Sequence, residues 1–353
     1  LYVAVAAVLV VTFITLIVGK TQIKESSKAA TVETKPRAEE EAKKKEAESP
    51  AIPSGRVQES SSYQGGPSSD LYLPPMLDMH YADTFGESNV HGRNVPVFWD
   101  VPRAGGTAIK FILGKCHGYI LASEDGKGHE TNSLEVFYSA SGGFANVDTY
   151  SFAGIEHAKS VGLSSSTEVD VIFSSHVHEI AEMLTNRHQG RLFTIIRNPV
   201  ERAVSFYYHE QAANMDYAGM SVVDFFTKPK TKHLVEDNWM TRYLTNKKEG
   251  RLNIEDVNLA MEILRRKFLI GLAENVPESL IRFKKHMGWK DTRRRGETNT
   301  VTCEQRFTVP NSHKNPTIEK GSQAWNVITE LNRYDMKVYD YAVNLFNEQA
   351  ESV

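Results

Sequence analysis

Cysteine is scarce in this sequence: only Cys116 and Cys303 occur among its 353 residues. This scarcity excludes a small disulfide-rich scaffold, and the 12 histidines do not cluster with the cysteines at the spacings of a zinc site. The net charge of -3 at pH 7 gives no indication of a nucleic-acid partner. We therefore expect neither a metal cofactor nor a nucleic-acid ligand. The two cysteines form either one disulfide or two buried thiols.

Two common nucleotide-binding signatures are missing as well. The chain contains neither the triphosphate-binding pattern of glycine, four residues and Gly-Lys-Ser/Thr nor the dinucleotide-binding pattern Gly-x-Gly-x-x-Gly. Their absence argues against ordinary kinases and dehydrogenases.

One long apolar run stands at the start of the chain. Residues 1–18 are apolar apart from Thr12 and Thr15, and Lys20 follows. This length predicts a membrane-spanning anchor over residues 1–19, with a cleaved signal peptide as the competing interpretation. Residues 20–70 are rich in Lys, Glu, Ala, Ser, Gly and Pro, which predicts a disordered stalk. Residues 71–353 are then one domain, long enough to bury a substantial core.

Within that domain, four short apolar runs are separated by amphipathic helical patterns rather than by hairpin turns. The runs cover residues 95–100, 169–173, 192–196 and 268–271. The expected helices cover residues 200–213, 234–245, 254–266, 278–287 and 325–347. This alternation predicts an α/β fold, an open parallel sheet flanked by helices, with ligands bound at the carboxyl ends of the strands.

The first of these strands leads into a turn suited to an anion. The run ending at Asp100 is followed by Pro102, Arg103 and the paired glycines Gly105 and Gly106, and then by an amphipathic segment. Glycines let the backbone approach a ligand closely, and the free amides of a first helical turn favour negative charge. The pattern therefore predicts a phosphate or sulfate site, although a Gly-Gly turn alone is often only a tight connection.

A second strand, residues 192–196, also leads directly into a helix. Asn198 is a good N-cap and Pro199 suits the first helical position, so Arg197 stands between the strand and the helix. Ser205 lies seven residues after Asn198, about two helical turns, and so shares its face of the helix. Arg197 and Ser205 together are suited to a second phosphate group.

A third strand end carries the candidate base. His176 and His178 follow the run 169–173, and a histidine accepts a proton near neutral pH because its usual pKa is about 6.5. Glu179 either orients one imidazole or is simply an acidic residue in the first turn of the next helix.

These motifs resemble the carbohydrate sulfotransferases that use 3'-phosphoadenosine 5'-phosphosulfate (PAPS), in particular the Golgi type II membrane enzymes of the heparan sulfate 2-O/6-O-sulfotransferase kind. The resemblance rests on Pro102-Arg103-Ala104-Gly105-Gly106-Thr107, on Arg197-Asn198-Pro199-Val200-Glu201-Arg202 and on Ser205. It extends from about residue 95 to residue 346, and it includes a segment that makes Arg242 a candidate for lining the acceptor cleft.

The resemblance implies a role for each matched residue. His176 is favoured as the general base and His178 is second. Arg103 stands where relatives usually carry a lysine that stabilises the leaving group, and Lys110 is the alternative cation. The residues implied in donor binding are Arg103, Ala104, Gly105, Gly106, Thr107 and Ala108 for the 5'-phosphosulfate, and Arg197 and Ser205 for the 3'-phosphate.

The function implied is metal-free transfer of a sulfuryl group from PAPS to a hydroxyl of a glycan or polysaccharide by in-line displacement. A Golgi membrane protein with a lumenal catalytic domain is the implied location. Two alternatives stay open: a catalytically silent nucleotide- or glycan-binding membrane protein of the same fold, and a nucleotide-dependent phosphotransferase.

Overall fold

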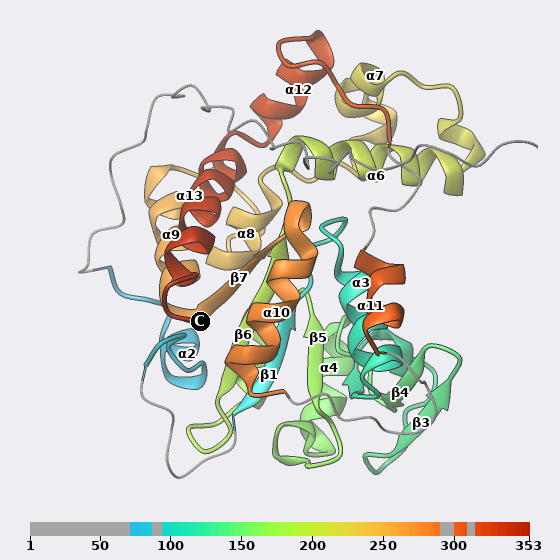
Figure 1. Ribbon diagram of the computed structural model, residues 1–353. Coiled ribbons are helices and arrows are strands. Elements are labelled where there is room, and N and C mark those ends of the chain that lie inside the picture. Colours follow the sequence, from blue (N-terminus) through green and yellow to red (C-terminus); the bar gives the residue numbers. More distant parts are fainter. Residues whose placement is uncertain (1–70, 87–93, 290–299, 309–314) are drawn as a thin grey trace, which may run out of the picture. The chain divides into compact units, whose positions relative to one another are not determined.

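The computed structural model describes residues 71–86, 94–289, 300–308 and 315–353 (Figure 1). The expected anchor, residues 1–19, and the expected stalk, residues 20–70, lie outside this part of the chain. Across the described ranges, no helix combines the length and the apolar character needed to cross a bilayer.

Seven described strands form one sheet in the order β3-β4-β2-β5-β1-β6-β7. Every neighbouring pair is parallel except β3 and β4. The strands are β1 (Val95–Trp99), β2 (Ile120–Ala122), β3 (Val136–Ser139), β4 (Gly142–Ala145), β5 (Val171–Ser174), β6 (Gly190–Ile196) and β7 (Phe268–Leu272). This mostly parallel sheet flanked by helices fits the open parallel sheet that the sequence predicts, apart from the β3–β4 pair.

The four expected strands are confirmed as β1, β5, β6 and β7, whereas β2, β3 and β4 were not predicted. The antiparallel hairpin of β3 and β4 corrects the expectation of a wholly parallel sheet. These strands have only three or four residues; β2 is buried and apolar but too short to be recognised, and Tyr138 on β3 is exposed.

Helices cover both faces of the sheet. They are α2 (Pro75–His80), α3 (Gly106–Phe111) continued by the π-helix η1 (Ile112–Cys116), α4 (Phe152–Ser160), α5 (Val177–Met183), α6 (Pro199–Ala213), α7 (Val222–Thr227), α8 (Trp239–Thr245), α9 (Ile254–Lys267), α10 (Val276–Met287), α11 (Thr300–Thr308), α12 (Gln323–Leu331) and α13 (Arg333–Gln349).

Two expected helices have different bounds. The helix expected over residues 325–347 is divided into α12 and α13 at Asn332, whose side-chain amide donates to the carbonyl oxygen of Ile328. The helix expected over 234–245 begins only at Trp239, because Asn238 adopts a left-handed backbone and its side-chain oxygen accepts from the amides of Tyr334 and Asp335. In both places an asparagine side chain bonds to the backbone instead of continuing a helix.

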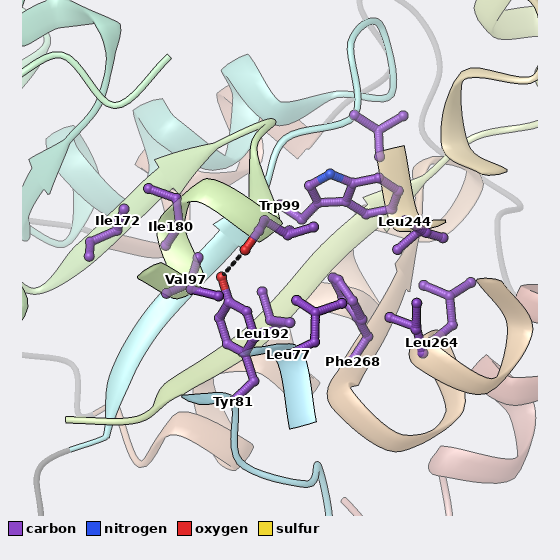
Figure 2. Packing of buried hydrophobic residues seen from close by; sticks show 14 of the residues in the cluster. Leu77, Tyr81, Val97, Trp99, Ile172, Ile180, Leu192, Leu244, Leu264 and Phe268 are labelled. Carbon is purple, nitrogen blue, oxygen red and sulfur yellow. Dashed lines mark hydrogen bonds between the residues drawn. The ribbon is translucent and has the colours of Figure 1, made fainter. Parts of the chain in front are cut away.

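The core has two layers because successive side chains of a strand point to opposite faces. Val97 and Trp99 of β1 face one layer, whereas Phe98 faces the other. The first layer, shown in Figure 2, packs the sheet against α2, α5, α8 and α9 through Leu77, Tyr81, Ile180, Leu244 and Leu264. The second layer packs Phe98, Phe173 and Phe193 against α3 and α10, and α10 crosses in front of the sheet in Figure 1.

Cys116 and Cys303 form a disulfide, which confirms the first of the two predicted alternatives. The bond joins the end of η1 to α11, although 187 residues separate the two cysteines in sequence. Beside it, the ring of Phe111 stacks on that of Phe307, with centroids 5.3 Å apart. The disulfide therefore fastens α11 to the helix that follows the first predicted anion-binding turn.

Replacing Cys303 with serine should lower the free energy of unfolding by about 2–4 kcal/mol, because the unfolded chain loses a closed loop of this size. Denaturant titration of the oxidised protein measures the change. Cys116→Ser should lower the free energy of unfolding by a similar amount. Replacing both cysteines should lower it little further than either single replacement. Reduction of the wild type with no shift of the unfolding midpoint would contradict this expectation.

Candidate functional site

The three strands that end in predicted site residues are neighbours in the sheet. β1 lies between β5 and β6 and is parallel to both (Figure 1). Trp99 pairs with Ser174 on one side and with Thr194 on the other. The segments that follow these residues therefore leave the same edge of the sheet, which brings the three predicted parts of the site together as expected.

The first turn has an unusual backbone. Arg103 and Gly105 adopt left-handed conformations, with φ of 66° and 116°. α3 begins at Gly106, where an added Cβ would lie 1.9 Å from Oδ1 of Asp100, so any side chain there would displace the Asp100 carboxylate. Of the remaining predicted donor-binding residues, Thr107 is exposed, Ala104 is buried and Ala108 is intermediate. The turn thus presents backbone rather than side chains beside a free helix start.

The second turn touches the first. Arg197 follows β6, and its Nη1 donates to the carbonyl oxygen of Arg103 at 3.3 Å. Asn198 caps α6 as predicted, since its side-chain oxygen accepts from the amides of Val200 and Glu201. Ser205 lies two turns along α6 and is partly exposed, with no hydrogen-bond partner for its hydroxyl among the described side chains and backbone groups.

Arg103 borders a pocket of about 210 Å³. Burial lowers the pKa of its guanidinium and Glu210 opposes the change, but arginine stays protonated at neutral pH. Besides Arg103, the pocket is lined by Pro102, Arg202, Ala203, Phe206, Phe226, Leu234, Val235, Glu236, Trp239 and Asn332. Two cations, Arg103 and Arg202, and the carboxylate of Glu236 therefore share this pocket with aromatic rings.

His176 stands directly before α5, at the end of β5. Its Nε2 lies 3.0 Å from the carbonyl oxygen of Tyr150, so Nε2 carries the proton in the neutral ring. Its Nδ1 lies 3.9 Å from Oε2 of Glu179, and both atoms are buried without a hydrogen-bond partner. Burial lowers the pKa of the imidazole, whereas Glu179 raises it; the net direction is down, so the ring is neutral at pH 7.

His178 lies in a different environment. Its Nε2 lies 2.8 Å from the carbonyl oxygen of Leu244, at the end of α8, and burial lowers the pKa of its imidazole. This contact ties α5 to α8. His176, unlike His178, therefore contacts a segment of the chain that in turn contacts the first turn.

Tyr150 makes that link. Its hydroxyl donates to Oδ2 of Asp100 at 2.6 Å, while its carbonyl oxygen contacts His176. Burial raises the pKa of the Asp100 carboxyl, and the hydrogen bond from Tyr150 opposes this. Lys110, the alternative cation, instead pairs with Glu124 at 2.5 Å and with Asp125 at 3.3 Å.

Two charged residues near the site were not given roles from the sequence. The ammonium of Lys248 lies 3.2 Å from the ring centroid of Tyr243, and burial lowers its pKa to about 8. Burial raises the pKa of Glu236, which lines the pocket beside Arg103. Glu236 belongs to a segment that carries the family resemblance, but nothing in the sequence around Lys248 indicates its position.

Arg242 does not face the small pocket beside Arg103. Its guanidinium is buried and donates to Asp237 at 2.9 Å and to the carbonyl oxygens of Lys247 and Gly250. It borders a second cavity of about 630 Å³, whose lining contains none of the residues predicted to bind the donor or to act as base. Its contacts therefore indicate a structural role in joining the two ends of α8.

In the ranges for which coordinates are described, no group of three or more His, Cys, Asp or Glu side chains is arranged to hold a metal ion.

Comparison with protein families gives one match. The model described as the sulfotransferase family matches residues 87–342, which is more than half of the chain. The match includes all three strand ends described above. A comparison with curated proteins gives no match.

Proposed function

The chain belongs to the sulfotransferase family, whose reaction is sulfuryl transfer, and from this premise we propose that its donor is PAPS and its acceptor a glycan hydroxyl. The observation that carries the proposal is the contact between the two turns, in which Arg197 donates to the backbone of Arg103. Two adjoining anion-binding turns suit a donor with phosphate groups at both ends. Arg197 and Ser205 then bind the 3'-phosphate, and residues 103–108 bind the 5'-phosphosulfate.

The proposed reaction is a single in-line displacement. The acceptor hydroxyl loses its proton to a base as its oxygen bonds to sulfur, and the bond from sulfur to the bridging phosphate oxygen breaks. The electron pair leaves with adenosine 3',5'-bisphosphate. Arg103 and the backbone amides after it stabilise the negative charge that grows on this leaving group.

We propose His176 as the base, with His178 second. Because burial lowers the pKa of His176, its neutral form persists below pH 6.5, and activity should fall only as the pH drops further. Both ring nitrogens are covered, Nε2 by the Tyr150 carbonyl and Nδ1 by its burial beside Glu179. The imidazole therefore has to turn when the acceptor binds, as catalytic hydrogen bonds often tighten only in the complex.

The cellular location is also a proposal. The resemblance implies an N-terminal anchor over residues 1–19 in the Golgi membrane and a lumenal catalytic domain. The disulfide between Cys116 and Cys303 supports an oxidising compartment of this kind.

One alternative is a catalytically silent protein that keeps the pocket. Arg103 favours it, because a planar guanidinium is not equivalent to a lysine at a site where a point charge follows the leaving group. The test is incubation of the full chain with PAPS labelled in its sulfate and a panel of glycans. Transfer of label to a glycan is expected. Binding of adenosine 3',5'-bisphosphate without transfer would favour the silent protein, and magnesium-dependent turnover of ATP would favour a phosphotransferase.

A further inference from the structure

His176 has a hydrogen-bond acceptor opposite each of its ring nitrogens. Nε2 lies 3.0 Å from the carbonyl oxygen of Tyr150, and Nδ1 lies 3.9 Å from Oε2 of Glu179. A neutral imidazole carries one proton, so only one of these nitrogens donates at a time. The surroundings of the ring therefore suit the imidazolium, which has a proton on both nitrogens. This is the form that a general base acquires when it removes a proton from an acceptor.

The unsatisfied side of the imidazole is the one toward Glu179. Nδ1 of His176 and Oε2 of Glu179 are both buried, and neither has a hydrogen-bond partner among the groups that the structure describes. With the proton on Nε2, two lone pairs face each other across this gap, and burying polar atoms in that state costs free energy. A proton on Nδ1 converts the same pair into a donor and an acceptor. Glu179 is therefore placed to hold the other tautomer of the ring.

A lysine from another segment lies beside this pair. The ammonium of Lys248, in the loop after α8, lies 3.2 Å from the ring centroid of Tyr243, and that ring is 6.0 Å from the imidazole of His176. Burial lowers the pKa of Lys248 to about 8, against the opposing effects of Glu179 and Glu236. Lys248 is thus mostly protonated at pH 7, and its charge acts on both members of the pair.

Charged groups from three segments of the chain act on the imidazole. Burial has the largest effect and lowers the pKa of His176; Glu179 raises this pKa and Lys248 lowers it. Asp148, in the segment before α4, also raises it, by a smaller amount. Two rings that contact the imidazole are uncharged at neutral pH, those of Phe152 and Tyr243. Glu179 and Lys248 therefore have opposite effects on the same group, which allows their roles to be tested by sign.

We propose, as an extension of the proposed function, that Glu179 is a positioning residue for the base. When the acceptor binds, the imidazole turns away from the carbonyl of Tyr150, Nδ1–H donates to the Glu179 carboxylate, and Nε2 faces the acceptor hydroxyl. The hydroxyl proton passes to Nε2 as the oxygen bonds to sulfur and the bond from sulfur to the leaving phosphate oxygen breaks. Glu179 stays ionised and stabilises the imidazolium, which returns its proton to water after the products leave.

Glu179→Gln removes the charge with little change of size. With the full chain, labelled PAPS and the best acceptor of the glycan panel, kcat should fall at least about tenfold, because an amide stabilises the imidazolium less well. The acid limb of the pH profile of kcat/KM should move to lower pH, since Glu179 raises the pKa of His176. The Kd for adenosine 3',5'-bisphosphate should stay unchanged. Glu179→Asp, which keeps the charge, should restore part of kcat. The control is Glu182→Gln, an exposed position of the same helix, which should change none of these quantities.

Lys248→Met tests the opposite sign. Because Lys248 lowers the pKa of His176, its replacement should move the acid limb to higher pH. The control Lys159→Met, at an exposed position of α4, should leave the limb in place. If Glu179 and Lys248 only supported the fold, their replacement would not shift the limb in opposite directions.

A double-mutant cycle identifies the imidazole through which Glu179 acts. The effect of Glu179→Gln on kcat should disappear when His176 is already alanine, because the carboxylate then has no base to position. An unchanged kcat and acid limb in Glu179→Gln, or an undiminished effect of this change in the His176→Ala background, would overturn the inference but leave sulfuryl transfer standing. Failure of the wild type to transfer label to any glycan would overturn both.

Discussion

Replacing Arg197 with alanine is expected to lower kcat/KM for PAPS by about 100-fold, because hydrogen bonds to a charged phosphate are among the stronger ones in proteins. Strand β6 ends just before Arg197 and the capped helix α6 begins soon after it, so both elements fix the position of the guanidinium. It also donates to the backbone of Arg103, so its loss removes this contact between the two turns. Calorimetry with adenosine 3',5'-bisphosphate should show weaker binding by a similar factor.

Arg187→Ala is the matched control for this change. Arg187 is an exposed arginine in the segment before β6, at the opposite end of that strand from Arg197. Its replacement should alter neither nucleotide affinity nor the unfolding midpoint. If Arg197→Ala folds normally and keeps full activity, Arg197 does not bind the donor.

Replacing Arg103 with alanine is expected to reduce kcat by about 10²–10³, the usual effect of removing one group that stabilises developing negative charge. Because the effect concerns the transition state, the affinity for PAPS itself should change much less than kcat. Single-turnover measurement with labelled PAPS separates the two quantities.

Two further variants distinguish charge from backbone conformation at this position. Arg103→Gly also removes the charge, but it suits the left-handed backbone, so it should be more stable than Arg103→Ala by about 1 kcal/mol while remaining as inactive. Arg103→Lys keeps the charge and should retain activity to within about tenfold. An alanine variant with wild-type kcat would show that another group stabilises the leaving phosphate.

The elements around the candidate site were predictable because each one carries a local signal. β1, β5, β6 and β7 are short apolar runs, and the Asn198 cap with Pro199 marks the start of α6. Since parallel strands end at a common edge, their order along the chain was enough to predict that the three turns meet. The sequence did not show that β1 lies between the other two, which the sheet order establishes.

The rest of the site depends on contacts between segments far apart in sequence. Lys248 lies near Glu179 only because α8 packs on α5, and no residue pattern records that contact. Likewise, the sequence does not decide whether Cys116 and Cys303 are bonded or free, because 187 residues separate them and only the fold brings them together. The sequence alone favours His176 over His178, but it does not show that the His176 imidazole meets the carbonyl of Tyr150 and the His178 imidazole that of Leu244.

Tyr150 belongs to neither turn, yet its hydroxyl is bonded to Asp100 and its carbonyl oxygen contacts His176. Any shift of Asp100 on nucleotide binding would therefore reach the imidazole through a single residue. Cooperativity between the two substrates follows from such a connection, and thermodynamics makes it symmetrical. Whatever factor the donor nucleotide applies to the affinity for the acceptor, the acceptor must apply to the affinity for the nucleotide.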